Sequence, residues 1–337
     1  MGMNTKVASK APAGLSSFLA PFSKYLQDDD VKEVCVNTPH AVFVETHKGW
    51  SQYTSEPLNM GFLTGLATAV GSFTKQEIST TKPILSGTLP DGERIQIVMP
   101  PAVPDGTMSI TIRRPSNKVW SLDELAEMGM FDNVATKTNE LSELDLALLE
   151  AHRGKHWTEF LSLAVRSKKN ILISGATGTG KTTFSKALIP LIPPDERIIT
   201  IEEAAELLPA QPNVVTLIAN RDAALQTADV LLTATLRMRP DRIILGEVRG
   251  KEAMTFLEAI NTGHGGSMTT LHAETPQLAV QRLAIAALKT EIPMTYADMV
   301  RYIESSIDVI IQTGRHNGAR GITEFYLPGM EKIGASA

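Results

Sequence analysis

The residues Asn170-Ile171-Leu172-Ile173-Ser174 are followed by the stretch Gly175-Ala176-Thr177-Gly178-Thr179-Gly180-Lys181-Thr182-Thr183. An apolar strand, this glycine-rich loop and the helical run 184–188 match the pattern G-x-x-x-x-G-K-[ST] of a phosphate-binding loop in its required context. Glycines let successive backbone N–H groups curl around phosphate oxygens, and the following helix adds its positive amino end. We therefore predict that residues 175–183 bind the phosphates of a nucleotide.

Two side chains of this loop are expected to act on those phosphates. In such loops the lysine, here Lys181, reaches the β- and γ-phosphates, and the hydroxyl group of the next residue, Thr182, ligates Mg²⁺. The expected substrate is ATP, with Mg²⁺ as the cofactor. The alternative is a glycine-rich turn, but average residue usage gives this pattern by chance in only about one chain of this length in a hundred.

Acidic residues follow two neighbouring apolar strands. The run 242–246 ends at Glu247, whose carboxylate is placed to orient or deprotonate the attacking water, the alternative being a solvated residue at a strand end. The run 199–201 ends at Glu202 and Glu203. Because adjacent residues on a strand point to opposite faces, we expect only one of this pair to face the nucleotide. The other is expected to cap the following helix or to lie in solvent.

Two histidines flank a further strand, predicted at 267–271. His264 precedes it in a glycine-rich turn, and His272 follows it directly. Imidazole groups in these positions can sense the phosphate state or couple it to a neighbouring subunit. A structural role is the alternative. The spacing does not suit a metal site, because it offers no cysteine and no i, i+4 pair.

The whole chain is predicted to be an α/β protein of two domains. Short apolar runs alternate with helical segments over residues 141–337, which indicates a mostly parallel sheet covered on both faces. These runs are 171–174, 197–201, 214–218 and 242–245. A smaller α+β domain is expected at 31–115, preceded by a flexible lead at 1–30. Residues 116–140 are predicted to form a linker with one short helix at 122–128.

The smaller front domain supplies two arginines that can reach a bound phosphate. Its predicted elements are strands at 31–36 and 108–113, a hairpin of 41–45 with 50–53, a helix at 58–75 and a hairpin turn at 90–92. Arg94 opens the strand after that turn, while Arg113 shares the polar face of its strand with Ser109 and Thr111. Either guanidinium group can act as an arginine finger on a phosphate presented by the second domain. The alternative is an ordinary surface arginine.

Composition and charge narrow the environment and the partners. The net charge of −5 and the pI near 5.9 argue against bulk binding of nucleic acid, which requires a basic face, so no direct sequence-specific nucleic-acid binding is expected. Cys35 is the single cysteine, which excludes an intrachain disulfide and favours a reducing compartment. The most apolar helix-like stretch, 63–73, is too short to span a membrane. We expect a cytoplasmic protein.

Four motifs in this order resemble those of the secretion-superfamily ATPases. They are a Walker A segment at 175–183, an Asp box at 199–203, an atypical Walker B at 239–250 and a His box at 262–273. Within the superfamily, the front-domain segment from Gly92 to Ser116 is similar to the hexameric traffic ATPases of type IV secretion and conjugation systems. The similarity extends over most of residues 30–315.

This resemblance implies a RecA-like P-loop domain and a homohexameric ring, with ATP held between front and rear domains. It implies that Arg94 and Arg113 contact the phosphates, with Arg114 as the substitute for the latter, and that His264 and His272 take part in the cycle. The Asp box departs from the family pattern, because it ends in two glutamates rather than Glu-Asp, which leaves open which acid serves Mg²⁺. The four-cysteine zinc insertion of type II secretion ATPases is absent.

The implied function is that of an ATP-hydrolysing ring motor that energises substrate transport or pilus assembly in a bacterial type IV secretion or conjugation system. The expected partners are further copies of the chain and the inner-membrane and coupling components of the machine, so the protein is expected to be peripheral at the inner membrane. Two alternatives stay open: a pilus-retraction or tight-adherence pilus ATPase of the same superfamily, and a nucleotide-gated docking scaffold. Glu247 and the complete Walker A segment argue against a scaffold that does not hydrolyse ATP.

Overall fold

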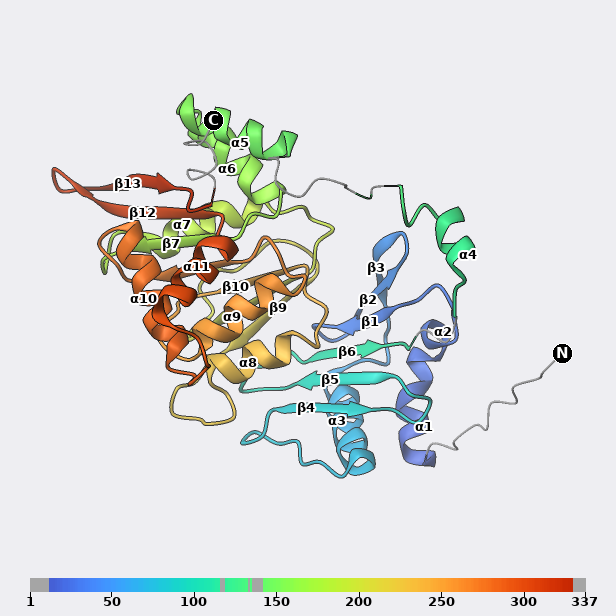
Figure 1. Cartoon of the computed structure of the whole chain (residues 1–337). Helices are drawn as coiled ribbons and strands as arrows, with labels where there is room; N and C mark the ends of the chain where they lie inside the picture. Colours follow the sequence, from blue (N-terminus) through green and yellow to red (C-terminus); the bar gives the residue numbers. More distant parts are fainter. Residues whose placement is uncertain (1–11, 116–118, 133, 135–141, 330–337) are drawn as a thin grey trace.

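The computed structural model describes residues 12–115, 119–132, 134 and 142–329. Two α/β units are visible in Figure 1: a front unit coloured from blue to teal, and a rear unit coloured from green to red. Helix α4 (Leu122–Glu127) lies between them in the chain, close to the helix predicted at 122–128. A capping box begins this helix, in which the Ser121 side chain and the Glu124 side chain each bind the other residue's backbone N–H.

The front unit is a six-stranded antiparallel sheet packed against helices. The strands lie in the order β3-β2-β1-β6-β5-β4. They are β1 (Glu33–Val36), β2 (Ala41–Thr46), β3 (Gly49–Thr54), β4 (Ile84–Thr88), β5 (Arg94–Val98) and β6 (Ser109–Arg113). Helix α3 (Met60–Thr74) places Leu63, Leu66 and Val70 in the core beneath this sheet. Both predicted hairpins, β2 with β3 and β4 with β5, are confirmed.

The first described residues are helical, which corrects the flexible lead over 13–26, whereas residues 1–11 lie outside the described residues. Residues 13–26 form helix α1 (Ala13–Leu19), the 3-10 helix η1 (Ala20–Phe22) and helix α2 (Ser23–Leu26). Phe22 is fully buried in the front core, and the rings of Phe18 and Phe62 meet edge to face with centroids 5.2 Å apart. Burial of these large side chains gives the stretch its structure, despite its content of Ala, Ser and Pro.

Seven strands form the mostly parallel sheet of the rear unit. Their order is β13-β12-β7-β11-β10-β8-β9, and β13 pairs antiparallel with β12 at the edge. The strands are β7 (Ile171–Gly175), β8 (Ile198–Glu202), β9 (Val214–Ile218), β10 (Arg242–Leu245), β11 (Met268–Leu271), β12 (Val309–His316) and β13 (Ala319–Tyr326). All neighbours from β12 to β9 run parallel. The predicted parallel sheet is therefore confirmed.

Helices cover both faces of this sheet, and a separate hydrophobic core lies on each face. One core includes side chains of α8 (Ala228–Thr235), α9 (Glu252–Asn261), α10 (Pro276–Leu288) and α11 (Tyr296–Ser306). The other includes side chains of α5 (Glu143–Arg153), α6 (Trp157–Arg166), α7 (Lys181–Leu188) and the 3-10 helix η2 (Ile189–Leu191). None of the described helices has the length and apolar character needed to cross a membrane.

The front unit is attached to the rear unit through buried polar contacts. Arg197, directly before β8, is fully buried, and its Nη1 donates to Asn37 Oδ1 of the front unit at 2.8 Å. Trp50 Nε1 donates to Asp241 Oδ2 at 3.1 Å. Arg239 forms a two-pronged ion pair with Glu45, with N···O distances of 3.0 and 2.5 Å. Bidentate pairs of this kind fix orientation, so the two units are held in one arrangement.

The contact between the front and rear units changes the environment of β6. The alternating sequence of this strand predicts one apolar face and one polar face. Ile110 and Ile112 lie in the front core. Ser109 and Thr111 are polar but also buried, each only 1% exposed. Thr111 Oγ1 accepts a hydrogen bond from Arg197 of the rear unit at 3.5 Å. The polar face of β6 therefore faces the interior of the protein, and only its last residue, Arg113, is exposed.

Candidate active site

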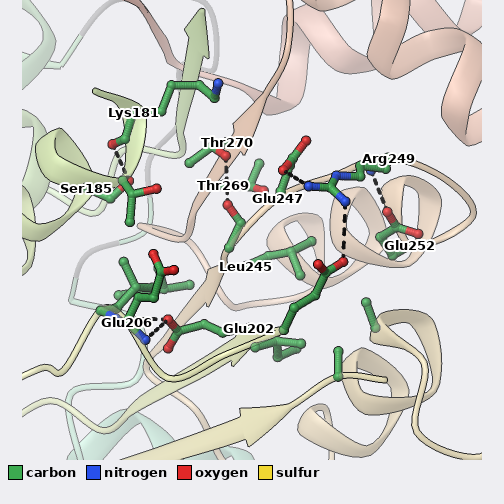
Figure 2. A pocket seen from close by; sticks show the side chains of 18 of the residues that line it. Lys181, Ser185, Glu202, Glu206, Leu245, Glu247, Arg249, Glu252, Thr269 and Thr270 are labelled. Carbon is green, nitrogen blue, oxygen red and sulfur yellow. Dashed lines mark hydrogen bonds and ion pairs between the residues drawn. The ribbon is translucent and has the colours of Figure 1, made fainter. Parts of the chain in front are cut away.

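The carboxyl-terminal ends of the parallel strands meet at one edge of the rear sheet, where ligands bind in open α/β sheets. The loop after β7, the pair Glu202 and Glu203 at the end of β8, Glu247 after β10 and His272 after β11 line one cavity of about 910 Å³. Figure 2 shows Glu247 and Arg249 side by side in this cavity, with Lys181 at the start of α7. The topology thus gathers residues that are about a hundred positions apart in the sequence.

The phosphate loop leads directly into α7, as predicted. Of its residues, those that line the cavity are Gly178, Gly180, Lys181, Thr182 and Thr183. Gly180 adopts φ +101°, a conformation that favours glycine, immediately before the helix begins. The hydroxyl groups of Thr182 and Thr183 lie in the first turn of α7 on exposed residues. The amino end of this helix is therefore open to an anion.

The remaining residues of the loop support it from behind. A Cβ atom at Gly175 would lie 2.0 Å from Thr313 Oγ1 of β12, so this position admits only glycine. Thr179 is buried, and its hydroxyl group donates to the Ala176 carbonyl at 2.8 Å and contacts Thr313 Oγ1 at 2.7 Å. Ala176 and Thr177 are exposed. Strand β12 thereby fixes the back of the loop.

Lys181 extends along the inner side of the loop. Its Nζ donates to the carbonyl groups of Gly175 at 2.8 Å and Ala176 at 3.1 Å, and lies 3.0 Å from His272 Nδ1. Burial lowers the pKa of this ammonium group, and the negative charge of Glu247 opposes that shift. The charge is thus held close to both the loop and the acid after β10.

His272 connects Lys181 to Glu247. Its Nε2 lies 3.1 Å from Glu247 Oε1. Because an ammonium group can only donate, Nδ1 accepts from Lys181 and a neutral imidazole carries its proton on Nε2, close to Glu247 Oε1, which has no hydrogen-bond partner among the described residues. Burial lowers the pKa of His272, and the positive charge of Lys181 lowers it further. Burial also raises the pKa of Glu247, with Lys181 opposing. Lys181, His272 and Glu247 form one continuous row of contacts.

The two acids at the end of β8 both line the cavity but have different surroundings. Glu202 is buried, and its carboxylate accepts hydrogen bonds from Thr200 Oγ1 and from the backbone N–H groups of Glu206 and Leu207, all at 2.8–2.9 Å. The expected helix after this strand is absent from the described residues, so Glu202 stabilises a loop instead of capping a helix. Glu203 is about half exposed and pairs with Arg221 Nε at 2.5 Å.

Three arginines that line the cavity were not assigned a role from the sequence: Arg221, Arg249 and Arg320. Arg249 Nη2 lies 2.6 Å from Glu247 Oε2, and its Nη1 lies 3.4 Å from Glu203 Oε1. Arg221 follows β9 and Arg249 follows β10, so the common edge of parallel strand ends was a signal for both. Together with Lys181 they bring cationic groups that can contact a polyanionic ligand into a cavity that also contains several carboxylates.

Other predicted residues lie outside the set that lines this cavity. His264 is at the opposite end of β11 from His272, where its Nδ1 lies 3.1 Å from the Pro240 carbonyl. Arg94 and Arg113 are opposite each other on β5 and β6, and Arg113 Nε lies 3.5 Å from Glu33. Arg114 binds the Asp28 carbonyl at 2.6 Å and pairs with Asp29. The site of a single chain therefore brings together the loop, the strand-end acids and His272, but not these side chains.

Comparison with known proteins gives consistent matches over nearly the whole chain. A family model described as Type II/IV secretion system protein matches residues 17–315. The Type IV secretion system protein VirB11 of Bartonella henselae is 42% identical over 324 residues, which cover 91% of this chain and 91% of that protein. The VirB11 protein of Brucella suis biovar 1 is 39% identical over 332 residues, covering 95% and 92%.

A solved structure agrees with these relatives. The crystal structure of the VirB11 ATPase from the Brucella suis type IV secretion system in complex with sulphate is 38% identical, with a TM-score of 0.91, and the match covers 98% of this chain and 99% of that one. The resemblance to secretion-superfamily ATPases, predicted from the four motifs, is confirmed. The chain belongs to the Type II/IV secretion system protein family.

Proposed function

We propose that this chain hydrolyses ATP as a ring motor and that the energy drives substrate transport or pilus assembly in a bacterial type IV secretion machine. The observation that carries the proposal is the row of contacts from Lys181 through His272 to Glu247, within a cavity formed by a phosphate loop. Such a row joins the group that binds the terminal phosphates to the group that activates water.

The residues of the site divide the reaction between them. Backbone N–H groups of the loop and the ammonium group of Lys181 hold the β- and γ-phosphates and stabilise the charge of the transition state. Glu247 accepts the proton of the attacking water, and because burial raises the pKa of its carboxyl group, it is a stronger base than an exposed glutamate. Arg249 donates to one oxygen of this carboxylate at 2.6 Å, and neutral His272 lies 3.1 Å from the other.

The oxygen donors in the cavity fit Mg²⁺. This ion prefers oxygen ligands and is usually held by one or two protein groups together with substrate phosphates. The Thr182 hydroxyl group and the Glu203 carboxylate both line the cavity, whereas the carboxylate of Glu202 is already hydrogen-bonded within its loop. Bound there, the ion would supply neutralisation of phosphate charge. The described residues contain no cluster of three or more His, Cys, Asp or Glu side chains suited to a metal, so the phosphates would complete the coordination.

The assembly and the partners rest on the relatives rather than on the site. Relatives that cover nearly the whole chain are type IV secretion system proteins, which supports a homohexamer bound to inner-membrane and coupling components at the cytoplasmic face. Light scattering in the presence of Mg²⁺ and ATP tests the ring directly. We expect hexamers, and a population of monomers alone at micromolar protein would contradict the motor.

Phosphate release by the purified protein tests the activity. Lys181→Ala is expected to abolish turnover and weaken ATP binding, because it removes the charge that meets the terminal phosphates. Lys186→Ala is the matched control, since Lys186 is an exposed lysine of the same helix α7. Unchanged turnover in Lys181→Ala would refute the role of the loop. A wild-type protein that binds ATP but releases no phosphate would instead support the docking scaffold.

A further inference from the structure

The hairpin of β12 and β13 places two arginines directly opposite each other. Arg315 and Arg320 are register partners, next to the tight turn at Asn317 and Gly318. Like charges at directly opposite positions of a strand pair destabilise a sheet. A local cost of this kind is expected where function requires it, so the pair needs an explanation in terms of a ligand.

The face of the hairpin that carries this pair is turned toward the phosphate loop. Side chains two apart on a strand share a face, so Arg315 lies on the same face as Thr313. Thr313 Oγ1 donates to the Ser174 carbonyl at 3.0 Å and contacts Thr179 Oγ1 at 2.7 Å. A Cβ atom at Gly178 would lie 3.8 Å from Arg315 Nη2. Arg315 is therefore beside the loop itself.

Arg320 reaches the same site from the second strand of the hairpin, because it is one of the residues that line the nucleotide cavity. The other two arginines of this cavity are each paired with a carboxylate, Arg221 with Glu203 and Arg249 with Glu247 and Glu203. In the described part of the chain neither hairpin arginine has such a partner. Two guanidinium groups without a carboxylate partner thus border a phosphate-binding loop.

The strand order indicates which phosphates they meet. Strand β12 lies on one side of β7, while β11 and β10, which precede His272 and Glu247, lie on the other side. The γ-phosphate is expected beside the hydrolytic groups His272 and Glu247. The hairpin therefore approaches the loop from the side opposite the γ-phosphate. The phosphates within its reach are those nearer the ribose, which ATP and ADP share.

We propose that Arg315 and Arg320 form a clamp that binds the phosphate chain of a nucleoside di- or triphosphate at the P-loop of their own chain. The anion between the two guanidinium groups offsets their mutual repulsion, and this contact is equally strong in the ground state and in the transition state. The clamp rests on the proposed function, because it requires a nucleotide at this loop. It differs from an arginine finger, which acts on the γ-phosphate alone.

Binding of ATP and of ADP to Arg315→Gln, Arg320→Gln and the double variant tests the clamp, with Arg166→Gln as a control at an exposed site on α6. We expect each single change to weaken the binding of both nucleotides by about tenfold, because each removes one charge-assisted contact at an exposed site. The turnover number at saturating ATP should stay within about twofold of wild type, because a uniformly bound group changes KM alone. Arg320→Lys should restore part of the affinity.

A second measurement separates the clamp from a structural role. The melting temperature without nucleotide should stay the same or rise in Arg320→Gln, since the change removes a like-charge repulsion. A lower melting temperature, or nucleotide affinities within about twofold of wild type in the double variant, would overturn the clamp. If Lys181→Ala weakens ATP binding while the hairpin variants bind ATP normally, the clamp proposal is refuted and the proposed function is not. If wild-type protein binds no ATP, the proposed function fails with it.

Discussion

The ammonium group of Lys181 lies 3.0 Å from Nδ1 of His272, so that nitrogen must accept rather than donate. The imidazole proton is then on Nε2, which lies 3.1 Å from Glu247. Lys181 and Glu247 thus contact the two nitrogens of one neutral imidazole ring. The pKa of His272 is lowered by burial and by the charge of Lys181. His272 is therefore a positioning residue whose amide replacement can preserve both contacts.

Replacement of His272 is expected to separate geometry from charge. His272→Gln retains an acceptor for Lys181 and a donor for Glu247, whereas His272→Ala removes both. We expect turnover to fall roughly ten- to hundredfold in the alanine variant, as misplaced catalytic groups do, and clearly less in the glutamine variant. Steady-state phosphate release measures both. His316→Ala, at an exposed position of the hairpin, is the control. Equal losses in the two His272 variants would contradict the positioning role.

Glu247→Gln is expected to uncouple binding from hydrolysis. The amide keeps the shape of the carboxylate but cannot accept the proton of water, so turnover should fall at least about a hundredfold. Binding of ATP should remain within about twofold of wild type, because the phosphates are held by the loop and Lys181. A fluorescent ATP analogue measures the binding. If turnover also survives, the base lies elsewhere, and Glu203 is then the candidate, because the Glu202 carboxylate is already hydrogen-bonded in its loop.

The buried carboxyl group of Glu33 is expected to make the free energy of unfolding depend on pH. Burial raises the pKa of this carboxyl group from 4.5 to about 7, with Arg113 opposing and Glu45 adding to the shift. Between these two values the folded protein binds more protons than the unfolded chain. The free energy of unfolding therefore decreases as the pH rises through this window, by at most roughly 3 kcal/mol, and levels off above it.

Glu33→Gln removes this ionisation and is expected to flatten the profile. The melting temperature of the variant relative to wild type should increase as the pH is raised from about 5 to about 8. Glu56→Gln is the control, since Glu56 is exposed. Parallel melting profiles for Glu33→Gln and wild type would show that Glu33 is ionised throughout, and the prediction would be wrong.

The nucleotide edge of the rear sheet was predictable from sequence because each part of it is local. The loop 175–183, Glu202, Glu247 and His272 each follow an apolar run directly, and parallel strands bring such ends to one edge. The same rule covers Arg221 and Arg249, whose positions after β9 and β10 were signals that we did not use. The turn Asn317-Gly318 was likewise a direct sequence signal for the hairpin of β12 with β13.

What sequence left undecided depends on contacts between distant segments. Glu202 is distinguished from Glu203 by hydrogen bonds from residues 206 and 207, and Glu203 from Glu202 by its ion pair with Arg221. The burial of Thr111 depends on Arg197, which is 86 positions away. His264 and His272 share a motif, yet β11 separates them, so one meets Pro240 and the other the phosphate loop. Residues 116–118, 133 and 135–140 of the predicted linker lie outside the described residues.

The last prediction concerns Arg94 and Arg113 of the front unit, which were expected to act as arginine fingers on a phosphate presented by the rear unit. In a single chain Arg113 pairs with Glu33 and does not line the cavity. Closure over the loop of the same chain would break the buried contacts of Arg197 and the ion pair of Arg239 with Glu45. Removing partners from buried charged groups is strongly unfavourable. We therefore expect these arginines to act on the nucleotide of a neighbouring copy.

Arg113→Ala is expected to lower turnover and to weaken the binding of ATP far more than the binding of ADP. Arg94→Ala is expected to have the same effects to a smaller extent. Arg153→Ala, in the last turn of α5, is the control and should change little. The melting temperature of each variant checks folding, because Arg113 also faces Glu33. Equal losses for ATP and ADP would assign Arg113 to folding or to the adenosine end of the ligand.

Mixing the variants Lys181→Ala and Arg113→Ala tests whether the arginine acts between subunits. Lys181→Ala lacks a working loop but keeps Arg113, and Arg113→Ala lacks the arginine but keeps the loop. If a neighbour supplies the arginine, some sites in a mixed ring combine an intact loop with an intact Arg113, so phosphate release recovers to a fraction of wild type. If the arginine acts within its own chain, no mixed ring contains a complete site. Absence of recovery in rings shown to exchange subunits would therefore refute action in trans and require the front unit to leave its contacts with Arg197 and Arg239.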